Sequence, residues 1–312
     1  MCIALLSTAH PSYSLILIGN RDEFLNRPTA PASWWPEPHS HVLGGRDLHR
    51  PVQGTWLGIT KQGRIAVLTN FKEDGPLPQG KVSRGAIIRA FLTDSHSDTE
   101  AFVREMLSSG VSRDAGGFSL VCGNVGQPLA VMSNRAASEA EIPWIHPGSA
   151  QTVGLSNAAY GDHDWKKVMD GERMLRDAVT QSLDEGESED DFIQRLIKLL
   201  STDTLPRLEQ DGEFETYIPE LRNTVFVPPI GHLPELRADE IAATTKKDKA
   251  FIPQKKEQVL GVNGLYGTQK QTVVLADHSG KVRLFERTLH DSNSRPIPIG
   301  QGDLDFTFEL QG

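Results

Sequence analysis

The chain has 312 residues, a formal net charge of -9 at pH 7 and a sequence pI of about 5.6. This charge argues against a general nucleic-acid binder, since neutralising phosphates needs a basic face. No apolar run approaches the ~20 residues needed to span a bilayer, and Met1 to Leu6 lacks the features of a signal peptide. The two cysteines, Cys2 and Cys122, make no disulfide framework, which predicts a reducing compartment and a cytoplasmic location.

Paired apolar runs open the chain. Residues 2–6 and 14–18 flank a turn and predict a buried hairpin, and residues 55–60 and 64–69 predict a second one. Between the two hairpins, residues 28–51 are rich in proline and tryptophan. We expect them to form one long ordered loop, a kind of segment that is often functional.

Helical patterns come next, and further strand patterns, two more helical patterns and late strand patterns follow them. The expected helices cover residues 83–92, 100–107, 165–179 and 191–200. The expected strands cover residues 118–122, 129–132, 152–156, 224–227, 272–276 and 282–285. Three stretches are expected to be surface loops: an acidic run at 184–191, a proline-rich run at 228–234 and a basic insertion at 244–256.

This order of elements predicts an α+β fold. Hairpins, then helices, then hairpins again indicate two antiparallel sheets with helices outside them, rather than alternating βαβ units. We find no internal repeat and no break in composition. Residues 1–312 are therefore predicted to form one domain, with a loosely packed tail from about Ser292.

Cys2 is the first candidate for chemistry. If Met1 is removed, the chain begins with a thiol and a free α-amine, whose reference pKa values are about 8.5 and about 8. One residue then carries both a nucleophile and a general base, which is the principle of N-terminal-nucleophile enzymes. Judged alone, Cys2 is better explained as a small apolar residue near the start of the chain.

The block Asn20-Arg-Asp-Glu23 is the second candidate, because it directly follows a buried strand. If the first two strands pair, this block lies close to Cys2. Arg21 is then able to steady a thiolate or a substrate carboxylate, and Asp22 to hold the α-amine. A turn closed by a salt bridge explains the same residues without a function.

Two asparagines, Asn70 and Asn157, each end an apolar strand. A side-chain amide donates hydrogen bonds without carrying charge, as an oxyanion hole requires. An asparagine also ends a strand by bonding to its own backbone, and for each residue alone this explanation is favoured.

These motifs stand together in the order of a known family. They are Met1-Cys2-Ile3, Asn20-Arg-Asp-Glu23, Gly44-Gly-Arg-Asp47, Gly54-Thr-Trp-Leu-Gly58, Leu68-Thr-Asn-Phe71, Leu155-Ser-Asn157 and Tyr266-Gly-Thr268. Over nearly its whole length the sequence resembles the NRDE family, also called the transport and Golgi organisation family. Gln269 departs from the family pattern, in which an arginine is expected after Tyr-Gly-Thr.

The resemblance implies a fold like that of N-terminal-nucleophile hydrolases, a four-layer αββα sandwich of two antiparallel sheets flanked by helices. Through a more distant similarity to choloylglycine hydrolases and penicillin V acylases, Cys2 is the implied nucleophile, Asp22 the aspartate near the α-amine and Arg21 its basic neighbour. Asn70 and Asn157 are the implied oxyanion and amine-positioning asparagines. The expected substrate contacts are Asn20, Glu23, Trp34 and Trp56.

Several functions stay open. The first is Cys2-dependent hydrolysis of an amide or thioester. The second is a non-catalytic carrier of haem or of a lipid-like ligand such as acyl-coenzyme A, with Trp34 and Trp35 as an apolar cover. The third is a scaffold at the Golgi surface that uses the acidic run. No cofactor or metal is expected to be required, and haem is a candidate ligand. The resemblance implies a Golgi or mitochondrial association beside the cytoplasm.

Overall fold

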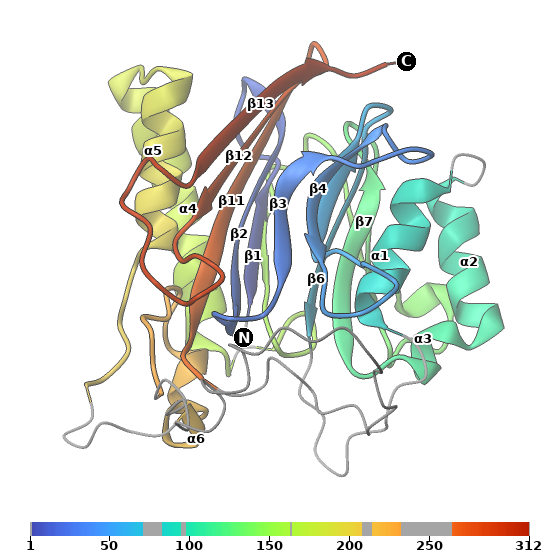
Figure 1. Ribbon diagram of the computed structural model, residues 1–312. Helices are drawn as coiled ribbons and strands as arrows, with labels where there is room; N and C mark the ends of the chain where they lie inside the picture. The colour runs from blue at the N-terminus through green and yellow to red at the C-terminus, as the bar shows by residue number, and fades with distance from the viewer. Residues whose placement is uncertain are drawn as a thin grey trace, which may run out of the picture.

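The computed structural model describes residues 2–70, 83–94, 98–162, 164–207, 214–231 and 264–311. They form two antiparallel sheets that face each other, with helices on both outer faces (Figure 1). The predicted four-layer αββα sandwich, the arrangement implied by the resemblance, is thereby confirmed. The expected basic insertion at 244–256 lies outside the described residues.

The first sheet, here called sheet A, has six strands within the described ranges. In spatial order they are β10 (Thr152–Leu155), β1 (Ile3–Ser7), β2 (Tyr13–Phe24), β11 (Tyr266–Asp277), β12 (Lys281–Thr288) and β13 (Asp303–Glu309). The predicted N-terminal hairpin is confirmed, because β1 and β2 pair from Ile3 opposite Asn20 to Ser7 opposite Ile16. The long central pair of β2 and β11 joins the start of the chain to its last third.

The second sheet, sheet B, has seven strands in the same described part of the chain. In spatial order they are β3 (Thr29–Trp34), β4 (Val42–Asp47), β5 (Leu57–Thr60), β6 (Arg64–Asn70), β7 (Phe118–Asn124), β8 (Leu129–Ser133) and β9 (Trp144–Ile145). Strands β5 and β6 form the predicted second hairpin.

Helices cover the outer face of each sheet (Figure 1). Over sheet A lie α4 (Lys166–Glu185) and α5 (Glu189–Leu200), and over sheet B lie α1 (Arg84–Thr93) and α2 (Thr99–Ser109). The shorter helices are α3 (Val111–Asp114), α6 (Phe214–Tyr217), η1 (Glu139–Glu141) and η2 (Glu220–Arg222). Within the described ranges, no helix is both long enough and apolar enough to cross a bilayer.

Strand β1 shows how the layers bury the chain on both sides. Ala4 and Leu6 pack in the core between the two sheets, whereas Ile3 and Leu5 pack against α4 and α5. Since both faces of the strand are covered, its apolar residues follow one another without alternation. This is why the continuous run at the start of the sequence predicts a buried strand.

The expectation of one long loop at residues 28–51 is wrong. The segment contains β3 and β4, which pair from Thr29 opposite Asp47 to Trp34 opposite Leu43. Strand β3 is an edge strand with a register shift between Ala30 and Ser33, and an edge or bulge is where a strand tolerates a proline such as Pro31.

The C-terminal segment is not a loose tail. Strand β13 pairs with β12 over seven positions and forms the edge of sheet A. Phe306 and Phe308 pack against the core between the sheets. Their spacing of two residues is a strand pattern, although it is too short to stand out in the sequence.

Two further expectations need correction. The acidic run at 184–191 is not a loop, because it contains the end of α4 and the first turn of α5. Acidic side chains are stabilised at a helix N-terminus, and Ser188 caps α5 by accepting a hydrogen bond from the Asp191 amide.

The expected strand at residues 224–227 is not formed. Among the described residues, the hydrogen bonds of this segment to β11 all go to Thr268.

Candidate functional site

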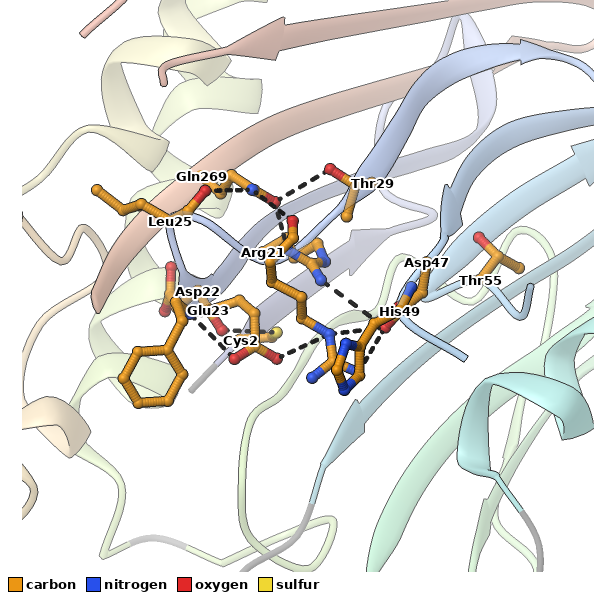
Figure 2. A network of polar contacts seen from close by, with 12 residues as sticks. Cys2, Arg21, Asp22, Glu23, Leu25, Thr29, Asp47, His49, Thr55 and Gln269 are labelled. Carbon is orange, nitrogen blue, oxygen red and sulfur yellow. Dashed lines mark hydrogen bonds and ion pairs between the residues drawn. The ribbon is translucent and has the colours of Figure 1, made fainter. Parts of the chain in front are cut away.

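Cys2 lies at an end of sheet A where several strands carry polar residues. The pairing of Ile3 with Asn20 brings Cys2 next to Arg21 and Asp22 on β2 (Figure 2). The Cys2 thiol lies 3.8 Å from the backbone oxygen of Asp22, and the Cys2 carbonyl accepts a hydrogen bond of 2.8 Å from the Ser156 hydroxyl. The half-buried cysteine is therefore held between β2 and the end of β10.

Arg21 is buried between the two sheets. Its guanidinium donates a hydrogen bond to the Gln269 side-chain oxygen and lies 4.0 Å from the Asp47 carboxylate (Figure 2). It also stacks 4.6 Å from the ring centre of Trp56. Burial lowers the pKa of Arg21, and the negative charges of Glu23 and Asp47 oppose that shift. Gln269 supplies an acceptor to Arg21, which the arginine of the family pattern cannot do.

Asp22 points to the opposite face of sheet A, toward α4. One carboxylate oxygen accepts a hydrogen bond of 2.8 Å from the Thr268 hydroxyl, and the other lies 4.0 Å from the Lys167 ammonium. The Asp22 and Lys167 side chains have no exposed surface. Burial raises the pKa of Asp22 and lowers that of Lys167, and the attraction between the two charges opposes both shifts.

A bulge in β11 directs these contacts. Thr268 pairs with Asp22 and Lys270 with Arg21, so Gln269 is the extra residue in the register. The bulge reverses the alternation of side chains along the strand. As a result Thr268 faces Asp22, whereas Gln269 faces Arg21 between the sheets.

The two asparagines lie side by side where β6 and β10 end. The Asn157 amide donates to the backbone oxygen of Asn70, and the Thr69 hydroxyl donates a 2.6 Å hydrogen bond to the backbone oxygen of Ser156. Asn157 is buried, while Asn70 is exposed. These bonds tie sheet A to sheet B next to Cys2, and they use one amide hydrogen of Asn157.

Of the four expected substrate contacts, Glu23 and Trp56 lie in this cluster. Glu23 is half-buried, and its carboxylate accepts from the Phe24 amide at 3.0 Å and lies 3.8 Å from Arg27 (Figure 2). Trp56 stacks on Arg21.

Asn20 and Trp34 do not join the cluster. Strand alternation turns Asn20 toward the helices, where its amide donates to the Leu200 and Val225 carbonyls at 2.8 and 2.9 Å. Trp34 lies at the other end of β3 from Thr29, with its ring centre 5.0 Å from that of Phe308. The expected apolar cover over the site is therefore not formed by Trp34.

Sequence reasoning missed Lys167, Thr268, Ser156 and Asp47 as members of the site. A signal existed for Lys167, since it lies four residues before Gly171 and eight before Leu175 on the buried face of α4. The other three stand in motifs that carry the family resemblance: Asp47, Ser156 and Thr268. Their partners come from distant parts of the chain, so the motifs mark these positions without indicating the contacts.

The two cysteines are expected to differ in reactivity. Cys122 is fully buried in β7, and burial raises the pKa of its thiol to about 12. Near neutral pH, iodoacetamide should therefore modify native protein at Cys2 alone, and both cysteines after denaturation. Peptide mapping by mass spectrometry measures the sites of modification, and native labelling of Cys122 at the rate of Cys2 would contradict the burial described here.

Two solved structures resemble this fold. Penicillin V acylase from Agrobacterium tumefaciens aligns with a TM-score of 0.40 and 13% sequence identity, covering 98% of this chain and 86% of that chain. The Caenorhabditis elegans N-acylethanolamine-hydrolyzing acid amidase ortholog aligns with a TM-score of 0.38 and 13% identity, covering 66% and 88%. Similarity at this level carries no conclusion about activity.

Sequence comparison gives a family. The model of the family Transport and Golgi organisation 2 matches residues 1–291. The Mus musculus Transport and Golgi organization 2 homolog is 28% identical over 292 residues, which cover 91% of this chain and 89% of that protein. The Homo sapiens homolog is 26% identical over 291 residues, with 90% and 89% covered. The chain thus belongs to the Transport and Golgi organisation 2 family.

Proposed function

We propose that this protein hydrolyses an amide or thioester bond, with Cys2 as the nucleophile. The observation that carries the proposal is the set of buried charges around one half-buried thiol. The Arg21, Asp22 and Lys167 side chains are buried, Arg21 and Asp22 lie on the strand next to Cys2, and Lys167 lies 4.0 Å from Asp22. Burying an ion costs several kcal/mol even after relaxation, so several such groups at one strand end indicate a functional site.

The reaction has two halves. Once Met1 is removed, the Cys2 α-amine takes the thiol proton while the sulfur bonds to the carbonyl carbon of the substrate. The carbon–nitrogen or carbon–sulfur bond then breaks, and the α-amine gives the proton to the departing amine or thiol. Water then gives a proton to the α-amine and attacks the carbonyl carbon of the acyl group on Cys2. The carbon–sulfur bond breaks, the sulfur takes the proton back, and a carboxylic acid leaves with the thiol restored.

The asparagine pair has a role in this scheme. The negative charge that develops on the carbonyl oxygen needs hydrogen-bond donors already in place. The Asn70 side-chain amide, exposed at the end of β6, is the proposed donor. Asn157 holds the Asn70 backbone by donating to its carbonyl oxygen. In this assignment Asn157 is a positioning residue.

A carrier of haem or of acyl-coenzyme A is the alternative, and the relatives' names associate them with transport and Golgi organisation. Pockets for such ligands are lined mainly by hydrophobic and aromatic side chains. Cys2 lies next to the charged residues Arg21 and Asp22 instead, and these contact Asp47 and Lys167. Hydrolysis is therefore the function that we propose.

Acylation of the native protein tests the proposal. Protein with Met1 removed, verified by intact mass, is incubated with a panel of acyl thioesters and N-acyl amides. We expect acid release for one substrate class and, on rapid acid quenching, an acyl adduct on the peptide that contains Cys2.

The matched control is the same chain with a permanent N-terminal extension, which keeps Cys2 but blocks its amine. We expect the extension to abolish turnover because it removes the proposed base. Equal turnover by the extended chain would reject the α-amine as the base. Saturable binding of haem or an acyl-coenzyme A without any acid release would favour the carrier instead.

A further inference from the structure

Lys167 occupies a position that is unfavourable for a lysine in two ways. Its side chain has no exposed surface, so its charge is removed from water. It is also the second residue of α4, and the first turn of that helix contains no acidic residue. A cation at a helix N-terminus faces the positive end of the helix dipole. Neither local structure nor burial favours a lysine here.

The compensation for this position comes from the Cys2 site. The Lys167 ammonium lies 4.0 Å from the Asp22 carboxylate and 5.9 Å from the ring centre of Trp165. Asp22 is fixed in turn by the Thr268 hydroxyl, and its backbone oxygen accepts from the Tyr266 hydroxyl at 3.1 Å. That same backbone oxygen lies next to the Cys2 thiol.

The charged groups around Cys2 come from three elements. Arg21 and Asp22 approach from β2, Arg84 from the first turn of α1 and Lys167 from the first turn of α4. Arg21 also contacts Asp47 and Gln269, and Arg84 also donates to the Gly117 carbonyl. Among these three cations, Lys167 has a side chain with no exposed surface. Its described ionic partner is Asp22, the residue beside the thiol.

We propose that Lys167 is a positioning residue that holds Asp22 beside Cys2 and balances the negative charge of that carboxylate, so that the thiol stays reactive. The inference rests on the proposed function in one respect, the identity of Cys2 as the nucleophile. It reaches beyond that function because it assigns the control of thiol reactivity to the helix layer outside sheet A.

The test is the rate of Cys2 alkylation by iodoacetamide as a function of pH, followed by peptide mapping. In Lys167→Met the pH at half-maximal rate should rise, and the rate near neutral pH should fall about tenfold, because the Asp22 carboxylate loses the ammonium that balances its charge and a nearby like charge disfavours the thiolate. Lys167→Arg keeps the charge and should recover most of the rate.

Lys166→Met is the matched control. Lys166 is the neighbouring lysine in the same helical turn, but its side chain is 62% exposed and pairs with Asp170 on the surface. Its replacement should leave the pH profile unchanged. If Lys167→Met does not fold, Lys167→Gln keeps a polar contact with Asp22 without the charge and should show the same shift.

A Lys167→Met or Lys167→Gln variant that folds and reacts with the wild-type pH profile overturns the inference, because a purely structural lysine affects stability alone. Alkylation needs no substrate, so the result is independent of turnover. A shifted profile in a protein that hydrolyses nothing supports the role of Lys167 and rejects the proposed hydrolysis.

Discussion

Cys2→Ala should reduce turnover of any substrate found for this protein by about 10⁴-fold or more, the order of loss seen when the nucleophile of a hydrolase is removed. The sulfur is the atom that forms the acyl intermediate, and the described structure places no second thiol beside it, because Cys122 is buried in β7. The measurement is kcat/KM for acid release, with the acyl adduct followed by intact mass.

Two further variants serve as controls for this measurement. Cys122→Ala removes the other cysteine and should leave kcat/KM within a few-fold of wild type, provided that the variant folds. Cys2→Ser keeps a weaker nucleophile at the same place and should retain an adduct that turns over slowly. Wild-type activity in Cys2→Ala would remove Cys2 from the reaction, and with it the proposed function.

Glu286→Ala should destabilise the fold by about 3–5 kcal/mol, the usual cost of leaving one partner of a buried ion pair alone. Glu286 and Lys270 are each 2% exposed, and the carboxylate accepts from the Lys270 ammonium at 3.0 Å. The same oxygen accepts from the Ala32 amide at 2.8 Å, which joins β12 to the bulged edge strand β3 of the other sheet. Denaturant unfolding followed by circular dichroism measures the loss.

The matched controls separate burial from charge. The double variant Lys270→Met with Glu286→Leu removes both charges, so it should be less destabilised than Glu286→Ala, although the Ala32 amide still loses its acceptor. Glu100→Ala removes a carboxylate that is 71% exposed and pairs with Arg104, and should cost at most about 1 kcal/mol. A Glu286→Ala variant as stable as Glu100→Ala would show that the buried pair contributes little.

Much of the fold was predictable because its central strands are buried on both faces. Their apolar runs are long and uninterrupted, as in the pair of β1 and β2, and such runs identify strands without any knowledge of their partners. Edge strands lack this signal. Strand β3 carries a proline and a register shift, and β13 has only two alternating phenylalanines, so both were expected to be irregular.

The candidate site was predictable in part for a related reason. Cys2, Arg21 and Asp22 belong to one hairpin, so pairing of neighbouring strands is enough to bring them together. Lys167 and Thr268 reach Asp22 only after α4 has packed on sheet A and β11 has paired with β2. The direction of each side chain was the second thing that the sequence did not show. The polar block at residues 20–23 alternates between the two faces of the sheet, so Asn20 points away from Cys2.

The bulge at Gln269 makes the length of β11 as important as its composition. Deleting Gln269 would leave Thr268 opposite Asp22 and Lys270 opposite Arg21, so the ladder would become regular and Thr268 would keep Asp22. The deletion would remove the local bend together with the side chain that accepts from Arg21, whereas Gln269→Ala removes the side-chain contacts alone. Alanine scanning keeps the length constant and cannot detect the contribution of the bend. A one-residue deletion at position 269 should therefore disturb Arg21 more than Gln269→Ala does.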